Sequence, residues 1–296
     1  MQIIEQFLNY LIADKGYSDA TYEVYRTTLM ELRKFFLSKD EALTWQTIDK
    51  DILRAWVAHC IEKGNAPRSV SKKMSAVRSL YKYMLRMNIV ASDPTRGIQN
   101  PQIPKRLPTF VKESEMDHLL DDIEFGEDYE GVRNKLILLT FYCTGIRISE
   151  LLGLCVKDVN LSNNELKVLG KRNKERIVPF VQELTNAFNA FFQLRKNIES
   201  IEGLHGKVFL RLDGTPMNAP EVRAIVKNYL SMVTNQKKRT PHVLRHTYAT
   251  VMLNNGADLE AVKNLLGHNQ ISTTEVYTHT TFTELKKEYD KAHPRA

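Results

Sequence analysis

The first hundred residues repeat apolar side chains at helical spacing, and a segment with three prolines then breaks the pattern. Apolar residues three and four positions apart predict amphipathic helices, which we place at about 2–14, 18–38, 50–64 and 67–87. The segment 99–108 has no such periodicity and is predicted to be a linker. We therefore expect an N-terminal helical domain at 1–98 and a second domain at 109–296.

The second domain mixes helical patterns with one hairpin. A long apolar helix is predicted at about 129–143, ending at Gly145. Residues 165–180 contain two β-rich runs around a polar turn, which is typical of a hairpin. Two further helices are expected, at about 182–200 and 218–235. The predicted fold class is mainly α, with a small antiparallel β-sheet in a mostly helical C-terminal domain.

Short polar side chains mark the expected helix starts, because they can accept hydrogen bonds from the first free backbone N–H groups. These residues are Ser18, Asp51, Asn218, Thr240, Asp258 and Thr281. Glu221 follows Asn218, and Glu284 follows Thr281, at the spacing of a capping box.

The composition of the 296 residues indicates a globular protein with an anionic partner. The net charge of +7 favours nucleic acid, and the acidic segment 113–130 is expected to be a solvated face turned away from it. Three widely spaced cysteines fit neither a disulfide framework nor a zinc site. The N-terminus lacks the basic start of a secretory signal, and the apolar run 136–143 is too short to cross a bilayer. We therefore expect a cytoplasmic protein with no membrane partner.

The predicted helix 67–87 carries six basic residues and no acidic one. Five of them fall within an arc of roughly 120° opposite the apolar side, and Lys73 lies outside that arc. Like charges without counter-charges repel one another unless phosphates lie alongside. We interpret this face as a DNA-docking surface, with a solvated face as the alternative. Its basic residues are Arg68, Lys72, Arg78, Lys82 and Arg86.

Residues that suit chemistry on a phosphodiester gather in the C-terminal domain. Arginine matches phosphate oxygens, histidine moves protons near neutral pH, and tyrosine can act as a covalent nucleophile. The candidates lie at or near predicted helix ends, where an anion is favoured, and are Arg147, His242, Arg245, His268 and Tyr277. A basic run that leads into the helix at Pro241 is assigned to DNA binding: Lys237, Lys238 and Arg239.

Each of these signals has a structural alternative when it is taken alone. His242 and His246 are spaced as a zinc pair, but Val243 stands where a metalloprotease helix needs Glu. Lys171 lies at the tip of the predicted hairpin, where charged residues are usually solvated. A lone tyrosine such as Tyr277 is ordinarily a packed residue. No cofactor or metal site is predicted.

The chain resembles the tyrosine recombinases of the lambda-integrase superfamily, and within them the Xer type. The resemblance covers nearly the whole length and rests on four motifs in order: TGIRISELLGL (144–154), GKRNKERIVPF (170–180), HVLRHTYAT (242–250) and LLGHNQISTTEVYTH (265–279). It implies a SAM-like N-terminal domain that binds the core site and a C-terminal catalytic domain. It also implies that the additional arm-binding domain of many phage integrases is lacking.

The resemblance implies a role for each candidate. Tyr277 would be the nucleophile that forms a 3′-phosphotyrosyl intermediate. The scissile phosphate would be held by two arginines with two histidines beside them: Arg147, Arg245, His242 and His268. Lys171, which follows Gly170, would be the general acid for the leaving 5′-oxygen. The physics agrees, because a phenol of pKa ~10 needs a base such as His242 at neutral pH.

The implied partner is double-stranded DNA with a specific core site, in a cytoplasmic, nucleoid-associated setting. The resemblance further implies a tetramer around a Holliday junction, held by a last helix that docks on the neighbouring subunit, although packing on its own domain uses the same apolar residues. A second, related recombinase as partner is compatible with it. Chromosome-dimer resolution, a part of chromosome partition and cell division, and mobile-element integration or excision both remain open. A type IB topoisomerase-like enzyme and a non-catalytic DNA-binding protein are the alternatives.

We predict that Lys171→Ala slows strand cleavage sharply on ordinary DNA, because the 5′-oxygen then leaves without a proton. Cleavage should recover on a substrate whose leaving group needs no proton. Single-turnover cleavage of both substrates checks this. If that substrate gives no recovery, Lys171 acts in phosphate binding instead.

Overall fold

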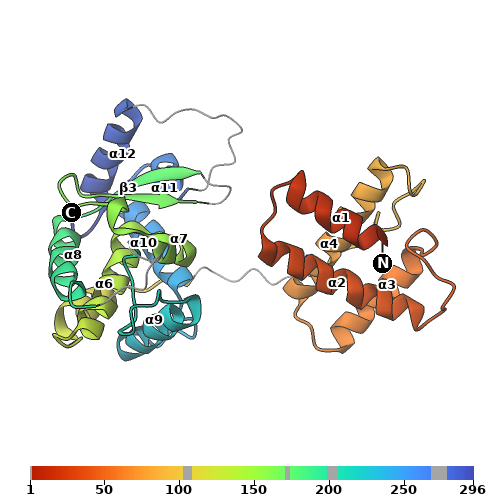
Figure 1. Ribbon diagram of the computed structural model, residues 1–296, viewed down its shortest axis with the longest axis horizontal. Coiled ribbons are helices and arrows are strands. Elements are labelled where there is room, and N and C mark those ends of the chain that lie inside the picture. The colour runs from red at the N-terminus through yellow and green to blue at the C-terminus, as the bar shows by residue number, and fades with distance from the viewer. Residues whose placement is uncertain (1, 103–108, 171–173, 199–205, 268–278) are drawn as a thin grey trace. The chain divides into compact units, whose positions relative to one another are not determined.

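The computed structural model describes residues 2–102, 109–170, 174–198, 206–267 and 279–296. The chain divides into two compact units, Met1–Arg106 and Leu107–Ala296 (Figure 1). The division falls within 99–108, the predicted linker. None of the helices in the described ranges is long and apolar enough to span a membrane.

The N-terminal unit consists of four helices around one apolar core. They lie within two residues of the predicted ranges and are α1 (Gln2–Ala13), α2 (Asp19–Leu37), α3 (Lys50–Glu62) and α4 (Pro67–Arg86). Helices α2 and α4 each pack against the other three. Fully buried side chains from every helix meet in the centre, among them Phe7, Leu32, Trp56 and Met74. The periodicity of the sequence therefore located these four helices correctly.

Of the two expected N-caps in this unit, Asp51 is wrong, whereas Ser18 holds the N-cap position without the expected hydrogen bond. Helix α3 begins after Asp49, whose carboxylate accepts from the backbone N–H groups of Asp51 and Ile52, so Asp51 lies in the first turn. Ser18 does precede α2, but its hydroxyl makes no capping hydrogen bond and instead contacts the hydroxyl of Thr21.

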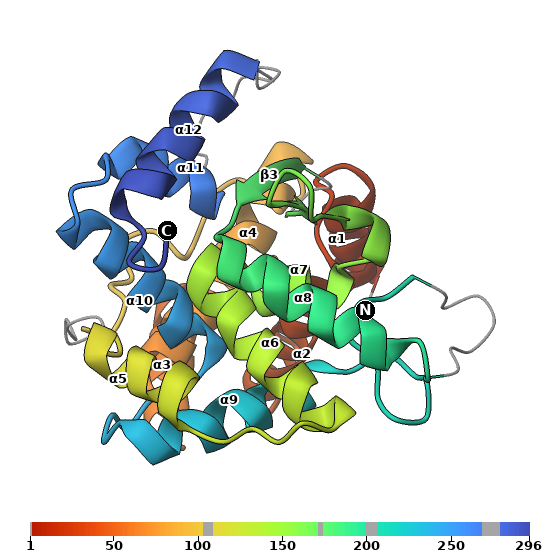
Figure 2. The ribbon, with the colours of Figure 1, turned by 90° about the vertical axis from the view of Figure 1, so that its left-hand side faces the viewer.

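The C-terminal unit is built around α6 (Tyr129–Thr144), in which Leu136 through Cys143 are all buried. A helix that is apolar on all sides belongs in a core, and α6 packs against α8 (Gln182–Arg195) and α10 (Pro241–Asn254) (Figure 2). Gly145 ends α6 in a left-handed conformation, as expected. The remaining helices are α5 (Glu113–Asp117), the π-helix η1 (His118–Asp122), α7 (Ile148–Gly153), the 3₁₀ helix η2 (Val156–Asp158), α9 (Ala219–Val233), α11 (Leu259–Leu266) and α12 (His279–Ala292).

A three-stranded antiparallel sheet in the order β1-β2-β3 contains the predicted hairpin. Strands β2 (Glu165–Leu169) and β3 (Glu175–Pro179) pair with Leu166 opposite Val178 and Leu169 opposite Glu175. The short β1 (Val159–Asn160) adds to β2 and was not predicted, because two residues carry no detectable alternation. Buried and exposed residues alternate along the hairpin, so one face covers the core.

Helix α12 packs on its own unit. It begins at His279, so Thr281 lies inside the helix and the predicted cap is wrong. Leu285, Tyr289 and Ala292 are buried in the core, and the Tyr289 hydroxyl donates to the carbonyl of Cys143 at 2.9 Å.

The segment after α12 is fixed to the acidic region near residue 120. The guanidinium group of Arg295 donates to Asp117 at 3.1 Å, to Asp121 at 2.6 Å and to Glu183 at 2.7 Å. Part of the acidic segment 113–130 therefore forms ion pairs with the side chain of Arg295 and is not a purely solvated face.

His293 should make folding sensitive to acid. It is buried against Tyr142, Tyr248 and Tyr289, and burial, opposed by a hydrogen bond to the Tyr142 carbonyl and reinforced by the charge of Arg295, lowers its pKa from 6.5 to about 4. The unfolded chain takes up this proton first, so the stability contributed above pH 6.5 is lost as the pH falls to about 4, by about 3 kcal/mol.

We expect His293→Phe to remove that part of the pH dependence, because phenylalanine keeps the ring packing and binds no proton. Urea unfolding between pH 7 and pH 4 checks this against His118→Phe, which removes an exposed histidine of the same unit. If His293→Phe and the unchanged protein lose stability in parallel, His293 is not the responsible group.

Candidate active site

Arg245 is held in the second turn of α10 with its guanidinium group buried. Pro241 occupies the first turn as predicted, but the side chain of Thr240 makes no capping hydrogen bond. Arg245 is 5% exposed and donates to the carbonyl of Gly145 at 2.7 Å and to that of Leu266. Burial, followed by the nearby charge of Arg147, lowers its pKa to about 10. It therefore remains charged at neutral pH.

Arg147 precedes α7, in the turn that follows Gly145. Its Nη1 donates to Glu150 Oε1 at 2.8 Å, and its Nη2 donates to the carbonyl of Gly267 at 3.2 Å. About a third of the side chain stays exposed (34%). The structure thus brings Arg147 and Arg245 together at the carboxyl end of α11, although they lie about a hundred residues apart in the sequence.

Glu150 is a site residue that the sequence analysis missed. Its carboxylate is 3% exposed and accepts four hydrogen bonds, from the backbone N–H and Nη1 of Arg147 and from Nη1 and Nη2 of Arg176. Burial alone would raise its pKa, but the hydrogen bonds and charge of Arg176, together with Arg147, hold the pKa below its usual value. The available signal was its position three residues after Arg147, where an acidic residue suits a helix start.

Three arginines share the carboxyl end of α11. Arg176 donates to the carbonyl of Leu265 at 2.9 Å, Arg245 donates to that of Leu266, and Arg147 donates to that of Gly267. The last carbonyls of a helix have no partner inside it and carry partial negative charge. We call Arg147, Arg176 and Arg245 the arginine cluster. Among the residues that the structure describes, Glu150 is the carboxylate that this cluster contacts, so three positive charges less one leave a net charge of +2 that suits a phosphate.

His242 and His246 lie side by side on α10. Their rings meet edge to face with centroids 4.6 Å apart, and His242 is the more exposed of the two. His246 therefore supports His242 through ring packing. Lys171, His268 and Tyr277 lie outside the described residues. The neighbouring Gly170 donates its backbone N–H to Lys174 at 2.7 Å and closes the end of the hairpin.

On α4, one stripe of residues runs along the helix at spacings of four and three. It consists of the exposed Arg68, Lys72, Ser75, Lys82 and Arg86 with the half-buried Ser79 in line, and we call it the basic stripe. Arg86 donates to the hydroxyl of Tyr10 at 2.8 Å, which fixes its direction. Arg78 is half-buried and donates to the carbonyl of Ile98 and to Asn100, so it lies beside the stripe rather than in it. Lys73 is paired with Glu31 at 2.6 Å, which explains why it departed from the pattern.

The C-terminal unit carries a second set of exposed basic residues. Lys237 and Lys238 are exposed, whereas Arg239 is half-buried and donates to the carbonyl of Thr234. Arg223 and Lys227 are exposed on α9 at a spacing of four, and the sequence analysis did not select them. Their amphipathic spacing opposite a buried apolar face was the available signal.

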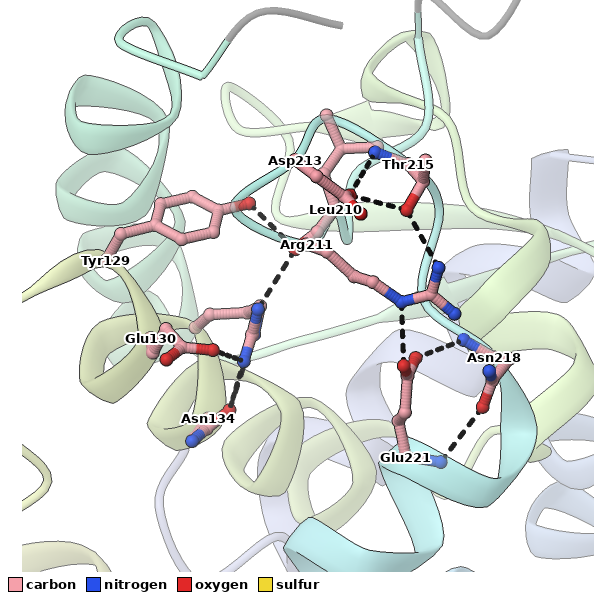
Figure 3. A network of polar contacts seen from close by, with 10 residues as sticks. Tyr129, Glu130, Asn134, Leu210, Arg211, Asp213, Thr215, Asn218 and Glu221 are labelled. Carbon is pink, nitrogen blue, oxygen red and sulfur yellow. Dashed lines mark hydrogen bonds and ion pairs between the residues drawn. The ribbon is translucent and has the colours of Figure 1, made fainter. Parts of the chain in front are cut away.

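A polar network holds the start of α9 in place (Figure 3). Asn218 and Glu221 form the predicted capping pair, and Glu221 also accepts from Arg211 at 2.7 Å. The carbonyl of Leu210 accepts from the hydroxyl of Tyr129 at the start of α6, at 3.1 Å. The turn after Leu210 therefore links the beginning of α6 to that of α9.

Comparison with known proteins covers both units. Residues 109–284 match the model of the phage integrase family, and residues 4–88 match that of the phage integrase N-terminal SAM-like domain. Tyrosine recombinase XerC of Chlorobaculum parvum is 35% identical over 317 residues, covering 99% of this chain and 94% of that protein. Tyrosine recombinase XerD of Halalkalibacterium halodurans is 35% identical over 293 residues, covering 99% and 98%.

Solved structures share the fold at lower identity. The Tn1549 transposon integrase in complex with transposon right end DNA gives a TM-score of 0.72 at 20% identity, covering 97% of this chain and 99% of that chain. The XerH site-specific recombinase bound to a palindromic difH substrate gives 0.70 at 21% identity, covering 96% and 83%. The predicted fold class is confirmed.

Proposed function

The chain belongs to the phage integrase family and is a site-specific tyrosine recombinase, and we propose that it breaks and rejoins DNA strands through a 3′-phosphotyrosyl link at Tyr277. The observation that carries this proposal is the arginine cluster at the end of α11. Arg147 precedes α7 and Arg245 lies on α10, and the two are fixed by backbone carbonyls and Glu150. Such preorganised cations can stabilise the charge that develops on a phosphate without moving during the reaction.

In the proposed cleavage step, the phenol oxygen of Tyr277 attacks the phosphorus while the bond from phosphorus to the 5′-oxygen breaks. His242, with His268 nearby, accepts the phenol proton, and Lys171 donates a proton to the leaving oxygen. Arg147 and Arg245 bind the non-bridging oxygens. The 3′-phosphotyrosyl ester keeps the bond energy, so a 5′-hydroxyl from another duplex can reverse the step without ATP, and this chemistry requires no metal ion.

DNA is the substrate, and we propose that the basic stripe of α4 docks on it. The stripe has cations at both ends and two short serines between them, so the DNA backbone or a DNA groove can approach α4 closely. The exposed basic residues of the C-terminal unit extend the contact by charge: Arg223, Lys227, Lys237 and Lys238. Arg78 and Arg239 contribute charge from half-buried positions.

We further propose that four copies assemble around a Holliday junction, with α12 docking on a neighbour, and that a second, related recombinase can take two of the places. In the single chain α12 packs on its own unit. Docking on a neighbour therefore requires α12 to leave that position. Chromosome-dimer resolution and mobile-element integration or excision both use this chemistry, and we expect action in the cytoplasm, at the nucleoid.

We predict that the protein forms a covalent adduct with a core-site duplex nicked next to the cleavage point, and that Tyr277→Phe abolishes it, because the phenol oxygen is the attacking atom. Denaturing gel electrophoresis detects the adduct. Tyr229→Phe is the control, since it removes a hydroxyl from α9 while keeping the ring stacked on Phe125. An adduct with Tyr277→Phe would overturn the assignment. Relaxation of supercoiled DNA with no site requirement would favour a topoisomerase instead.

We predict that Lys72→Ala weakens DNA binding and flattens its dependence on salt, by about 0.9 in the slope of log K against log salt for one lost phosphate contact. Lys73→Ala, one residue further on, should leave the slope unchanged because Lys73 is engaged by Glu31. Binding titrations at several salt concentrations measure both. If Lys72→Ala and Lys73→Ala give the same slope of log K against log salt, then α4 is not part of the DNA interface.

A further inference from the structure

Arg176 is a charged residue in a position that ordinarily takes an apolar one. It lies on β3 between Glu175 and Ile177, which are exposed, and its own side chain is 8% exposed. The buried face of the hairpin otherwise contributes apolar side chains such as Val168 and Val178 to the core. A buried arginine is costly unless all its donors find acceptors.

The donors of Arg176 reach two other elements. Its Nη1 and Nη2 donate to the two oxygens of Glu150 at 2.7 and 2.9 Å, and its Nε donates to the carbonyl of Leu265 at 2.9 Å. It also lies against Gly267, where an added Cβ would come within 3.1 Å of Nη1. One side chain therefore ties the hairpin to α7 and to the end of α11.

We propose that Arg176 is a positioning residue of the strand-cleaving site, acting through Glu150 on Arg147 and through the end of α11 on Arg245. This inference rests on the proposed function. Glu150 accepts from both Arg147 and Arg176, so the carboxylate that orients Arg147 is itself held by Arg176. The carbonyls that receive Arg245 and Arg147 directly follow the one that receives Arg176.

The charge of Glu150 depends on a few groups. Arg147 before α7, Arg176 on β3 and Arg245 on α10 surround it. A hollow beside Glu150 is also lined by Cys155, Asp158, Lys167 and Glu175. Helix α9, which packs on α7, buries apolar residues. Burial opposes the charge of Glu150, and Arg176 supplies the largest effect in its favour. Removing Arg176 should therefore raise the pKa of Glu150.

The test measures single-turnover adduct formation on the nicked duplex from pH 5.5 to 8.5. We expect Arg176→Met to slow it by about tenfold to a hundredfold at neutral pH, as when partners that orient a functional side chain are removed. The acid limb of the pH profile should move to higher pH, because Glu150 becomes protonated there and stops holding Arg147. Arg176→Lys keeps the charge but not the two-pronged contact, so it should give a smaller slowing and a smaller shift.

Arg195→Met is the matched control. Arg195 is a half-buried arginine that likewise donates to backbone carbonyls, those of Lys207 and Val208, and it lies remote from the arginine cluster. We expect it to keep the unmodified rate and pH profile. Thermal unfolding and DNA affinity, measured for all variants, exclude loss of fold or binding as the cause; if Arg176→Met does not fold, Arg176→Lys decides.

A double substitution separates the route through Glu150 from general destabilisation. With Glu150→Gln already present, Arg176→Met should add less than about threefold and should no longer move the acid limb. The inference is overturned if Arg176 variants slow the reaction uniformly at all pH values, or if the two substitutions multiply. If the unmodified protein and Arg195→Met form no adduct, the proposed function itself fails.

Discussion

The site depends on one arrangement: three arginines donate to three successive carbonyl oxygens at the end of α11. Guanidinium groups repel one another, so an unliganded site needs fixed negative charge to hold them. The carboxyl end of a helix supplies it as partial charge, and Glu150 supplies a full one. Hydrogen bonds with a charged partner contribute about 1.5–3 kcal/mol each, which helps to offset the burial of Arg176 and Arg245.

Two glycines make this arrangement sterically possible. Gly145 has a φ of +59°, and a Cβ there would lie 2.6 Å from the ring of Tyr248, yet its carbonyl is an acceptor for Arg245. Gly267 has a φ of +66°, and a Cβ there would crowd Arg176. Both residues end helices, so the turns that stop α6 and α11 also bring their carbonyls to the arginines.

Local pattern in the sequence predicted most of the fold. Helices such as α2 and α4 were located because their apolar spacing is regular over many turns, and α6 because its run of apolar residues ends at a glycine. The cap at Asp49 and the start of α12 at His279 were missed, since several polar residues in each stretch can serve as caps. Sequence periodicity says which face is buried but not which of several short side chains accepts the hydrogen bond.

The candidate site was only partly predictable. Arg147, His242 and Arg245 stand near helix starts, and their chemistry indicated the role that we propose for them. Glu150 gave only the weak signal of its position three residues after Arg147, and Arg176 gave none, because its buried charge is paired with a carboxylate that lies 26 residues away in the sequence. Long-range pairing of this kind is set by the tertiary fold, which a local pattern does not contain.

The packing of the C-terminal tail constrains an assembly of the kind proposed here, in which α12 docks on a neighbouring copy. Tyr289 is fully buried, and exposing a side chain of that size to water costs roughly 4–6 kcal/mol. A departing tail must therefore fill the matching pocket of another copy, so that each molecule gives one tail and accepts one. Contacts of this head-to-tail kind close into a ring when the rotation between successive copies divides a full turn, and otherwise propagate as an open filament.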